Sequence, residues 1–159
     1  LAEKPDVIFV DPNTDTTGIA VLKTLKQFGW TGQTYGNFFG GDAATLATPE
    51  ASQMIFFADP DVSGNQVKQR FFTDYAAQFG AAPTLTYWAS AQYDAVYAVS
   101  DAFKSVGANS EKIRDYLYGL KTFTGALGTY HFDSNGDSVG VSPSVKVIES
   151  GAAVPYKVQ

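Results

Sequence analysis

The middle of the chain, about residues 61 to 120, carries helical patterns only and no segment typical of a strand. Apolar residues recur there at helical spacing in three stretches, and Gly80 and Gly107 end the first two. Helices with such faces either pack on one another or cover a sheet. We favour the second arrangement, in which they cover a sheet that this chain does not contain.

Local signals place these three helices. The first is expected to begin at a capping box, Ser63-x-x-Gln66, and the second to span about residues 87–106. Asn109 or Ser110 is expected to cap the third. The second helix is apolar on more than one side, so we expect it to have neighbours on more than one face.

The first 58 residues instead alternate short apolar runs with helical segments. The apolar runs lie at residues 6–11, 33–41 and 52–58. The first is continuous and reads as a strand buried on both faces, and the third reads as a further buried strand. A helix capped by Thr14 or Asp15 follows the first run, and a short helix at residues 42–47 follows the second. This order predicts a parallel sheet with right-handed crossovers.

The end of the chain returns to strand patterns. Strands are expected near residues 128–132 and 144–149, joined by a turn over residues 133–137 that contains Asn-Gly. A second turn is expected at residues 150–152.

Composition excludes several classes of function. The net charge is −5 and no cluster of Lys or Arg occurs, which opposes binding to nucleic acid. No apolar run approaches the roughly 20 residues that a membrane span needs. The chain has no cysteine, as suits an exported protein. It starts at Leu1 without a signal peptide, so we expect it to be processed or part of a longer protein.

No catalytic, metal or cofactor site is expected. His131 is the single histidine, and a strand position beside a turn favours a structural role. The segment from Asp133 to Asp137 resembles the start of a calcium loop, but Ser138 replaces the required Gly and Ser144 the required Glu. Glycine-rich phosphate loops are missing after each strand, so nucleotide binding is unsupported.

The remaining candidate is a ligand-binding site at one edge of the predicted sheet, because ligands of open α/β sheets lie outside the carboxyl ends of the strands. The candidate residues there mix polar and aromatic groups, as small-molecule pockets do. They are Asp11, Asn13 and Thr14 after the first strand, Asn37, Phe38 and Phe39 after the second, and Asp59 after the third. The carboxylates of Asp11, Asp15, Asp42, Asp59 and Asp61 read mainly as helix caps and turn formers.

Several motifs, in this order, resemble the periplasmic binding proteins of the Leu/Ile/Val-binding class. They are the strand opening Lys4-Pro5-Asp6-Val7-Ile8-Phe9-Val10, the helix from Phe71 and Tyr75 to Gly80 and Pro83, the triplet Tyr93-Asp94-Ala95, and Gly125-x-x-Gly128 followed by Phe132-Asp133 and Gly136-Asp137. The resemblance runs through essentially all 159 residues.

The resemblance implies the periplasmic binding protein type 1 fold. This α/β fold has two three-layer α/β/α lobes with parallel sheets, joined by crossing hinge strands, and this chain would supply part of each lobe. Residues 1–58 would belong to lobe 2, residues 59–62 would cross, and residues 63–124 would form the helical part of lobe 1. Residues 125–140 would cross back, and residues 141–159 would add the C-terminal strands of lobe 2.

The implied function is that of a solute-binding component of an ABC importer, not an enzyme, which captures a small polar solute by hinge closure. Its partners would be a membrane permease and the N-terminal half of the same protein, in the periplasm or outside the cell, lipid-anchored in a Gram-positive organism. The alternatives are a ligand-sensing domain of a receptor or an amide-type regulator on the same fold, and, less favoured, a flavodoxin-like enzyme.

The resemblance also implies site residues. Tyr93 matches a lobe-one tyrosine of the ligand cleft, and residues 11–14 match a lobe-two ligand loop. Where amino-acid binders have a Glu that pairs with the ligand ammonium, this chain has Phe38. Asp11 or Asp15 would then replace that Glu, or the ligand is an amide, a urea-like solute or an aromatic acid rather than a branched-chain amino acid.

Overall fold

The chain folds as two compact units in the computed structural model, which describes residues 3–61 and 63–157. Unit 1 comprises residues 1–59 and 143–159, and unit 2 comprises residues 60–142. The chain therefore leaves unit 1 once, after Asp59, and returns once, after Ser142. The crossing expected at residues 59–62 includes residue 62, and the ranges expected for lobe 2 include residues 1–2 and 158–159; these five residues lie outside the described part.

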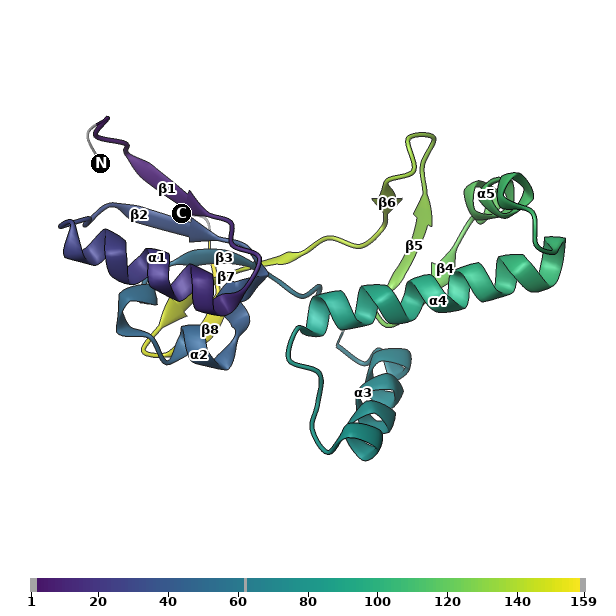
Figure 1. Ribbon diagram of the computed structural model, residues 1–159, viewed down its shortest axis with the longest axis horizontal. Helices are drawn as coiled ribbons and strands as arrows, with labels where there is room; N and C mark the ends of the chain where they lie inside the picture. Colours follow the sequence, from purple (N-terminus) through teal and green to yellow (C-terminus); the bar gives the residue numbers. More distant parts are fainter. Residues whose placement is uncertain (1–2, 62, 158–159) are drawn as a thin grey trace. The chain divides into compact units, whose positions relative to one another are not determined.

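Unit 1 alternates strands and helices, as the sequence predicts (Figure 1). Its elements are β1 (Val7–Val10), α1 (Asp15–Gln27), β2 (Gln33–Gly36), the 3-10 turn η1 (Phe38–Gly41), α2 (Ala43–Leu46), the 3-10 turn η2 (Pro49–Ala51), β3 (Ile55–Ala58), β7 (Ser144–Glu149) and β8 (Ala152–Pro155). The sheet has the order β1-β2-β3-β7-β8, in which β1, β2 and β3 pair in parallel and β7 pairs antiparallel with both β3 and β8. The predicted parallel sheet is thus confirmed for three strands, and the C-terminal strands make it mixed.

The second strand is shorter than predicted. It ends at Gly36, because the Asn37 side chain accepts a hydrogen bond from the Phe39 backbone N–H at 3.0 Å and turns residues 38–41 into η1. The first helix begins as expected at Thr14, whose hydroxyl accepts from the Thr17 backbone N–H. The predicted turn after β7 is present, with positive φ angles at Ser150 and Gly151 that suit a tight hairpin.

Only one face of this sheet is covered within the described residues. The core lies between the sheet and α1, α2 and η2, and its largest members are Leu22, Phe39, Met54, Phe56 and Ile148. On the other face Phe9 is 53% exposed and Phe57 is 43% exposed, with Val7 and Val145 also exposed. The prediction that the first strand is buried on both faces is therefore wrong, because no layer of the described residues packs on that second face, whereas β3, in the run at residues 52–58, is buried as predicted except for Phe57.

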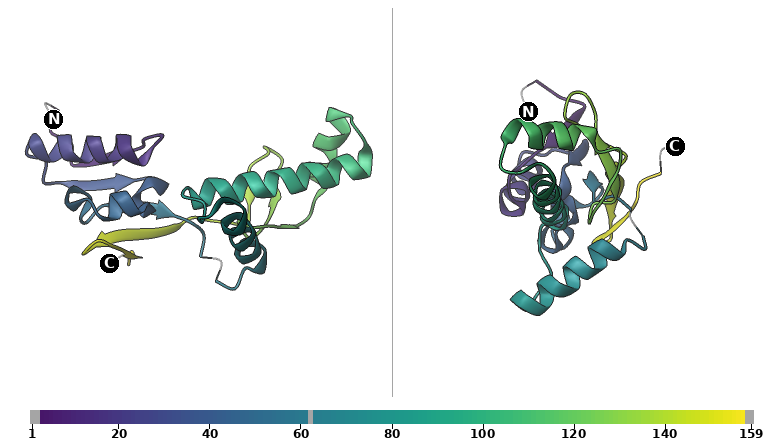
Figure 2. Two further views of the ribbon diagram at one scale, coloured as in Figure 1. Left: turned by 60° about the horizontal axis from the view of Figure 1, so that its bottom comes forward. Right: turned by 90° about the vertical axis from the view of Figure 1, so that its right-hand side faces the viewer.

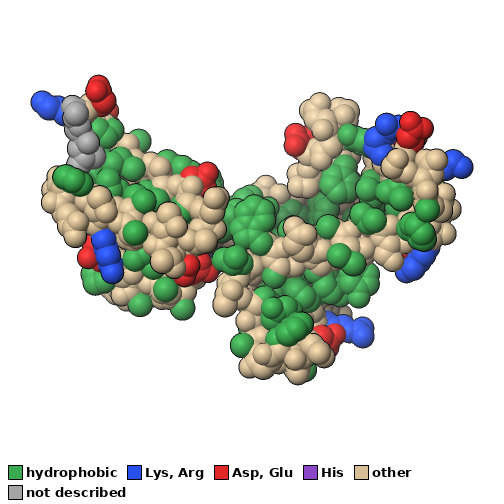
Figure 3. Space-filling view, in the orientation of Figure 1, with side chains coloured by type: hydrophobic (Ala, Val, Ile, Leu, Met, Phe, Trp, Pro, Cys, Tyr) green, Lys and Arg blue, Asp and Glu red, His purple; other side chains and the backbone are tan. Residues whose placement is uncertain are grey.

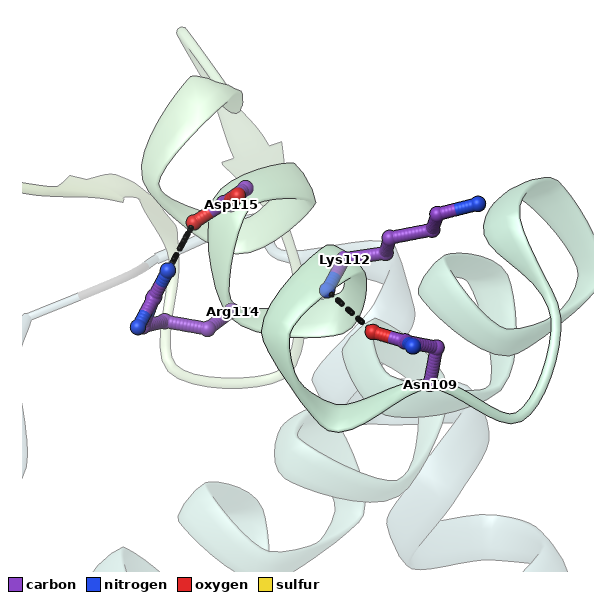
Figure 4. A network of polar contacts seen from close by, with 4 residues as sticks. All are labelled: Asn109, Lys112, Arg114 and Asp115. Atoms are coloured by element: carbon purple, nitrogen blue, oxygen red, sulfur yellow. Dashed lines mark hydrogen bonds and ion pairs between the residues drawn. The ribbon is translucent and has the colours of Figure 1, made fainter.

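The described residues of unit 2 form three helices and a small sheet. Its elements are α3 (Gln66–Phe79), α4 (Thr86–Val106), α5 (Ser110–Gly119), β4 (Phe123–Thr124), β5 (Thr129–Phe132) and β6 (Ser138–Val139). The strands form an antiparallel meander in the order β4-β5-β6. Asn109 caps α5, as expected, by accepting from the Lys112 backbone N–H at 3.0 Å (Figure 4).

Two local predictions in unit 2 are corrected. The cap of α3 is Asn65 rather than Ser63, because the Asn65 side-chain oxygen accepts from the backbone N–H groups of Val67 and Lys68. The turn at residues 133–137 joins β5 to β6, not to β7, which lies in the sheet of unit 1. Its Asx geometry is as expected, because the Asp133 carboxylate accepts from the backbone N–H groups of Asn135 and Asp137.

The long helix α4, which is drawn as a coiled ribbon in Figure 2, has side chains in three different surroundings. Small residues and Asp94 form a buried face, and Tyr93 lies on the side that meets α3. A third stripe is apolar and exposed, and hydrophobic side chains are visible over α4 in Figure 3. Its members are Trp88, Val96, Val99 and Phe103. The expectation that α4 is covered on more than one face is met only in part: α5 packs on it and the Phe71 ring of α3 stacks on Tyr93, whereas Val96 and Tyr97 are exposed.

Candidate ligand-binding site

The carboxyl ends of β1, β2 and β3 meet at one edge of the unit 1 sheet, because the three strands are parallel (Figure 1). Asp11 follows β1, Asn37 follows β2 and Asp59 follows β3. The Asn37 amide N–H donates to the Asp11 carboxylate at 2.5 Å and to the Pro12 carbonyl at 3.2 Å. The loops after the first two strands are therefore joined into one polar edge.

Asn37 is the residue that organises this edge. Its amide nitrogen holds Asp11, and its amide oxygen caps η1 at the same time. Both ends of the side chain are thus engaged within the protein, which leaves Asn37 a role in orienting Asp11. Asn13, in the loop after β1, is exposed.

Thr14 lies at the same edge but serves the helix. Its hydroxyl accepts from the Thr17 backbone N–H at 3.2 Å and shares a hydrogen bond with the Thr17 hydroxyl at 3.0 Å. Asp15 is turned toward the backbone N–H of Thr16, at 2.7 Å. These contacts fix the first turn of α1 beside the loop that carries Asn13.

The two phenylalanines after β2 lie in different surroundings. Phe38 is half-buried, whereas the Phe39 ring is 4% exposed and belongs to the core. That ring fills the space beside two glycines: a Cβ on Gly18 would lie 2.5 Å from it, and a Cβ on Gly36 would lie 2.9 Å from it. Phe39 therefore supports the polar edge through the packing of its ring in the core.

Asp42, which begins α2, is the carboxylate with the most unusual surroundings at this edge. One of its oxygens is buried without a hydrogen-bond partner among the described residues, and its side chain makes no capping bond to α2. Burial, together with the negative charges of Asp15 and Asp59, raises the pKa of Asp42 from 3.8 to about 6. A cation or hydrogen-bond donor that reached the Asp42 carboxylate would stabilise its charged form and lower its pKa.

The chemistry of this edge is that of hydrogen-bond acceptors. Between Lys26 and Lys68 the sequence has no basic residue, and the groups that act on Asp42 are all acidic. Within the described ranges, no group of three or more His, Cys, Asp or Glu side chains is placed to hold a metal ion. Ligand groups that donate hydrogen bonds or carry positive charge fit this edge, whereas a ligand carboxylate would be repelled.

Tyr93, the remaining residue predicted from the sequence, lies in unit 2. Its ring stacks on Phe71 of α3 with the centroids 4.3 Å apart, and the Tyr97 ring follows at 4.7 Å. A hydrogen bond with Tyr97 is the main cause that raises the pKa of Tyr93. The ring remains half-exposed, so one side of this aromatic cluster is open to solvent.

The neighbouring Asp94 has a structural role that sequence analysis did not assign. Asp94 is fully buried, and its carboxylate accepts from the backbone N–H groups of Ala126 at 2.5 Å and Leu127 at 3.0 Å. The Tyr130 hydroxyl donates to the same carboxylate. Burial raises the pKa of Asp94, while these three hydrogen bonds oppose the shift. The carboxylate thus anchors the hairpin between β4 and β5.

The same hairpin explains the spacing Gly125-x-x-Gly128. A Cβ on Gly125 would collide with the Asp94 carboxylate, and Gly128 has a φ angle of 130°. The sequence shows the Asp94 triplet and this glycine motif as two separate patterns. Their contact could not be read from spacing, because Gly125 follows Asp94 by 31 positions in the sequence.

A model of one protein family matches most of the chain. This family is described as periplasmic binding protein, and it matches residues 1–145. Among curated proteins no match was found. In the part of the chain that the structure describes, no helix has the length and apolar character needed to cross a membrane.

Several solved structures share the fold. A leucine-binding protein of Thermotoga maritima is 22% identical with a TM-score of 0.74, and the match covers 98% of this chain and 45% of that protein. A branched-chain amino acid substrate-binding protein of Streptococcus pneumoniae, solved with isoleucine, is 22% identical with a TM-score of 0.71, covering 93% and 42%. An ABC transporter solute-binding protein of R. palustris, solved with benzoate, is 16% identical with a TM-score of 0.68, covering 97% and 43%.

These structures are of binding proteins, and the chain spans less than half the length of each of the three. They share with it the α/β architecture of the periplasmic binding protein type 1 fold. The expected fold is thereby confirmed, with the chain as part of it. With the family match over residues 1–145, this chain belongs to the periplasmic binding protein family.

Proposed function

We propose that the protein is the extracytoplasmic solute-binding component of an ABC importer and holds a small polar solute between two lobes. The observation that carries the proposal is the polar edge of unit 1, where Asn37 joins the loops after β1 and β2 and presents Asp11. Ligands of open α/β sheets lie at such an edge. Asp11, Asn13, Phe38 and Asp42 form this half of the site, and Phe39 supports it from the core.

The other half of the site is proposed to come from unit 2 and from the part of the protein outside this chain. Tyr93 supplies an aromatic wall with a hydroxyl at its tip, a combination that suits a cleft with a partly polar ligand. The open sheet face of unit 1 and the open stripe of α4 support a second half of the protein that completes both layers. Closure of the two lobes on the solute is the mechanism that the importer would recognise.

The acceptor character of the edge narrows the solute class. Similar proteins have been solved with isoleucine, leucine and benzoate. Because the unit 1 edge lacks basic side chains, we assign it to an ammonium, amide or urea group of the solute. Any carboxylate of the solute would be bound by the part of the protein outside this chain.

Calorimetry of the full-length protein tests this proposal. The panel contains branched-chain amino acids, the matching amides, urea-type solutes and aromatic acids without a nitrogen donor. One of the first three classes is expected to bind at one solute per protein, and the aromatic acids are expected to bind less tightly. Heat from none of the compounds would contradict the solute-binding role, and preference for the aromatic acids would contradict the assignment of the edge.

The importer role needs a separate test. Cells that lack the gene should lose uptake of the radiolabelled solute identified by calorimetry, and a copy of the gene should restore it. The protein is expected in the periplasm, or outside the cell on a lipid anchor in a Gram-positive organism. Normal uptake in the deletion strain, with solute binding intact, would favour a sensor built on the same fold.

A further inference from the structure

The Tyr93 ring contacts two other aromatic rings within unit 2. It stacks on Phe71 of α3, with the ring centroids 4.3 Å apart and the ring planes at 29°. It also meets Tyr97, one helical turn later on α4, with the centroids 4.7 Å apart and the planes at 44°. Aromatic pairs at such separations contribute more than the area that they bury. Contacts with two rings therefore restrict the positions that the Tyr93 ring can adopt.

The hydroxyl of Tyr93 has a partner as well. It forms a hydrogen bond with the Tyr97 side chain, and this bond is the first cause that raises the pKa of Tyr93, followed by burial. A hydrogen bond raises the pKa of a phenol that donates it, because donation stabilises the neutral form. The Tyr93 O–H is therefore engaged by the Tyr97 oxygen, and the lone pairs of the Tyr93 oxygen remain for another group.

Two side chains fix the helices that carry these rings against one hairpin. At the start of α3, the Asn65 amide donates to the Ala126 carbonyl at 3.2 Å and to the carbonyl before it at 2.8 Å. From α4, the Asp94 carboxylate accepts from the Ala126 backbone N–H. Ala126 is fully buried and is thus bonded through both its N–H and its C=O. The two helices are thereby held in place close to the stacked rings of Phe71 and Tyr93.

We propose that Phe71 and Tyr97 are positioning residues for solute binding, which hold the Tyr93 ring and engage its O–H, so that the Tyr93 oxygen meets the solute as a hydrogen-bond acceptor. The solute then presents an N–H or O–H donor to Tyr93. The assignment of Tyr93 to the solute comes from the proposed function, on which this inference rests. The two positioning residues act through Tyr93 and need not contact the solute themselves.

Tyr97→Phe tests the role of the hydroxyl, because it keeps the ring and removes only the oxygen that accepts from Tyr93. In carbon NMR of the full-length protein without solute, labelled at the tyrosine Cζ, the Tyr93 signal should move at neutral pH. The signal is assigned by its absence from Tyr93→Phe. The pKa of Tyr93 should also fall toward its ordinary value in Tyr97→Phe.

Calorimetry then tests the effect on solute binding. The probe is the amino acid, amide or urea-type solute that binds most tightly in the panel described above. Tyr97→Phe should weaken its binding about fivefold, as expected for the loss of one hydrogen bond. Phe71→Leu keeps an apolar side chain on α3 but removes the stacked ring, and it should also weaken binding about fivefold.

Two matched controls make the same chemical changes further along α3. Tyr75→Phe removes a hydroxyl from the ring that lies 6.0 Å from Phe71, and Phe79→Leu removes a ring that packs on Tyr75 and is 67% exposed. Both controls should bind the same solute within about twofold of the unchanged protein. Tyr75→Phe should also leave the Tyr93 Cζ signal in place.

A Tyr93 signal that stays in place in Tyr97→Phe, full affinity in Tyr97→Phe or Phe71→Leu, or an equal loss of affinity in the controls would overturn the inference. If Phe71→Leu fails to fold, Tyr97→Phe decides alone, because it removes one hydroxyl from a side chain that is 50% exposed. Tyr93→Ala separates the two proposals. Full affinity in that variant would remove Tyr93 from the proposed site, whereas weak binding there with full affinity in Tyr97→Phe would contradict the positioning role alone.

Discussion

Asp94 is an acidic side chain with 0% exposure, and its burial is tolerated because two backbone N–H groups and the Tyr130 hydroxyl satisfy it. A buried carboxylate without such partners would cost several kcal/mol. The residue therefore couples α4 to the hairpin at residues 125–128 through buried hydrogen bonds. Water could replace these bonds only at a cost in free energy. In the sequence the same Asp is visible only as part of a Tyr-Asp-Ala triplet.

Asp94→Ala is expected to lower the free energy of unfolding by about 3 kcal/mol, because it leaves the N–H groups of Ala126 and Leu127 without their acceptor. Urea unfolding of the full-length protein measures the change. Asp101→Ala on the same helix removes an exposed carboxylate and should change it by less than about 0.5 kcal/mol. Equal effects at both positions would show that the hairpin does not depend on Asp94.

Asp42 is expected to give the stability of the protein a pH dependence. Its pKa of about 6 in the folded state lies above 3.8, so the folded protein binds more protons than the unfolded chain between about pH 4 and pH 6. Stability from this group is therefore present below about pH 4, falls as the pH rises to about 6, and stays lower above it.

Asp42→Asn removes that charge and keeps a polar side chain of nearly the same size. At pH 7.5 the variant should be more stable by about 1 kcal/mol, a value reduced for the partial solvent screening of the carboxylate. At pH 4 the two proteins should unfold at the same urea concentration. A stabilisation of equal size at both pH values would mean that the charge of Asp42 is not its cause.

At the scale of single residues, the sequence predicted which residues follow the strands of unit 1, but not the contacts that each of them makes. Asp11, Asn13, Thr14 and Asn37 do lie after strands whose ends meet, because parallel pairing follows from the alternation of elements. The bonds of Asn37 to the loop after β1 and of Asn65 to the hairpin join distant parts of the chain. Such pairs depend on tertiary structure and leave no local signal.

At the scale of elements, α4 and the sheet of unit 1 share one property: each has an apolar face that nothing in the described chain covers. Phe103 on α4 is 52% exposed, and Phe9 on β1 is 53% exposed. Amphipathic periodicity predicted the helices and most strands, because it depends on neighbours within one element. It could not tell whether a second layer covers the far face, which explains why burial on both faces was expected for β1.

Phe103→Gln tests whether the stripe of α4 is covered in the full-length protein. If a layer packs on it, the variant should lose about 2 kcal/mol of unfolding free energy, because an apolar ring is exchanged for a buried amide. Lys104→Gln, at the next position, should be within about 0.5 kcal/mol of the unchanged protein. A loss of less than about 0.5 kcal/mol for Phe103→Gln would place the stripe in solvent and contradict a completing layer.

At the scale of the whole molecule, the chain consists of two units with separate sheets, and less than half of each similar structure is represented in it. The order of motifs predicted the family, and the structure brings two of these motifs together at the contact of Asp94 with the hairpin that begins at Gly125. The solute is not fixed by these residues, since the proposed site is divided between this chain and the rest of the protein.

The central claim is that one solute is held by residues of both units, and calorimetry of four variants of the full-length protein tests it most directly. Asp11→Ala in unit 1 and Tyr93→Ala in unit 2 should each weaken binding of the same solute by at least about tenfold, at unchanged stoichiometry. The controls Asp6→Ala, before β1, and Tyr118→Ala, an exposed tyrosine of α5, should bind within about twofold of the unchanged protein. Full affinity in either Asp11→Ala or Tyr93→Ala would contradict a site shared by the two units.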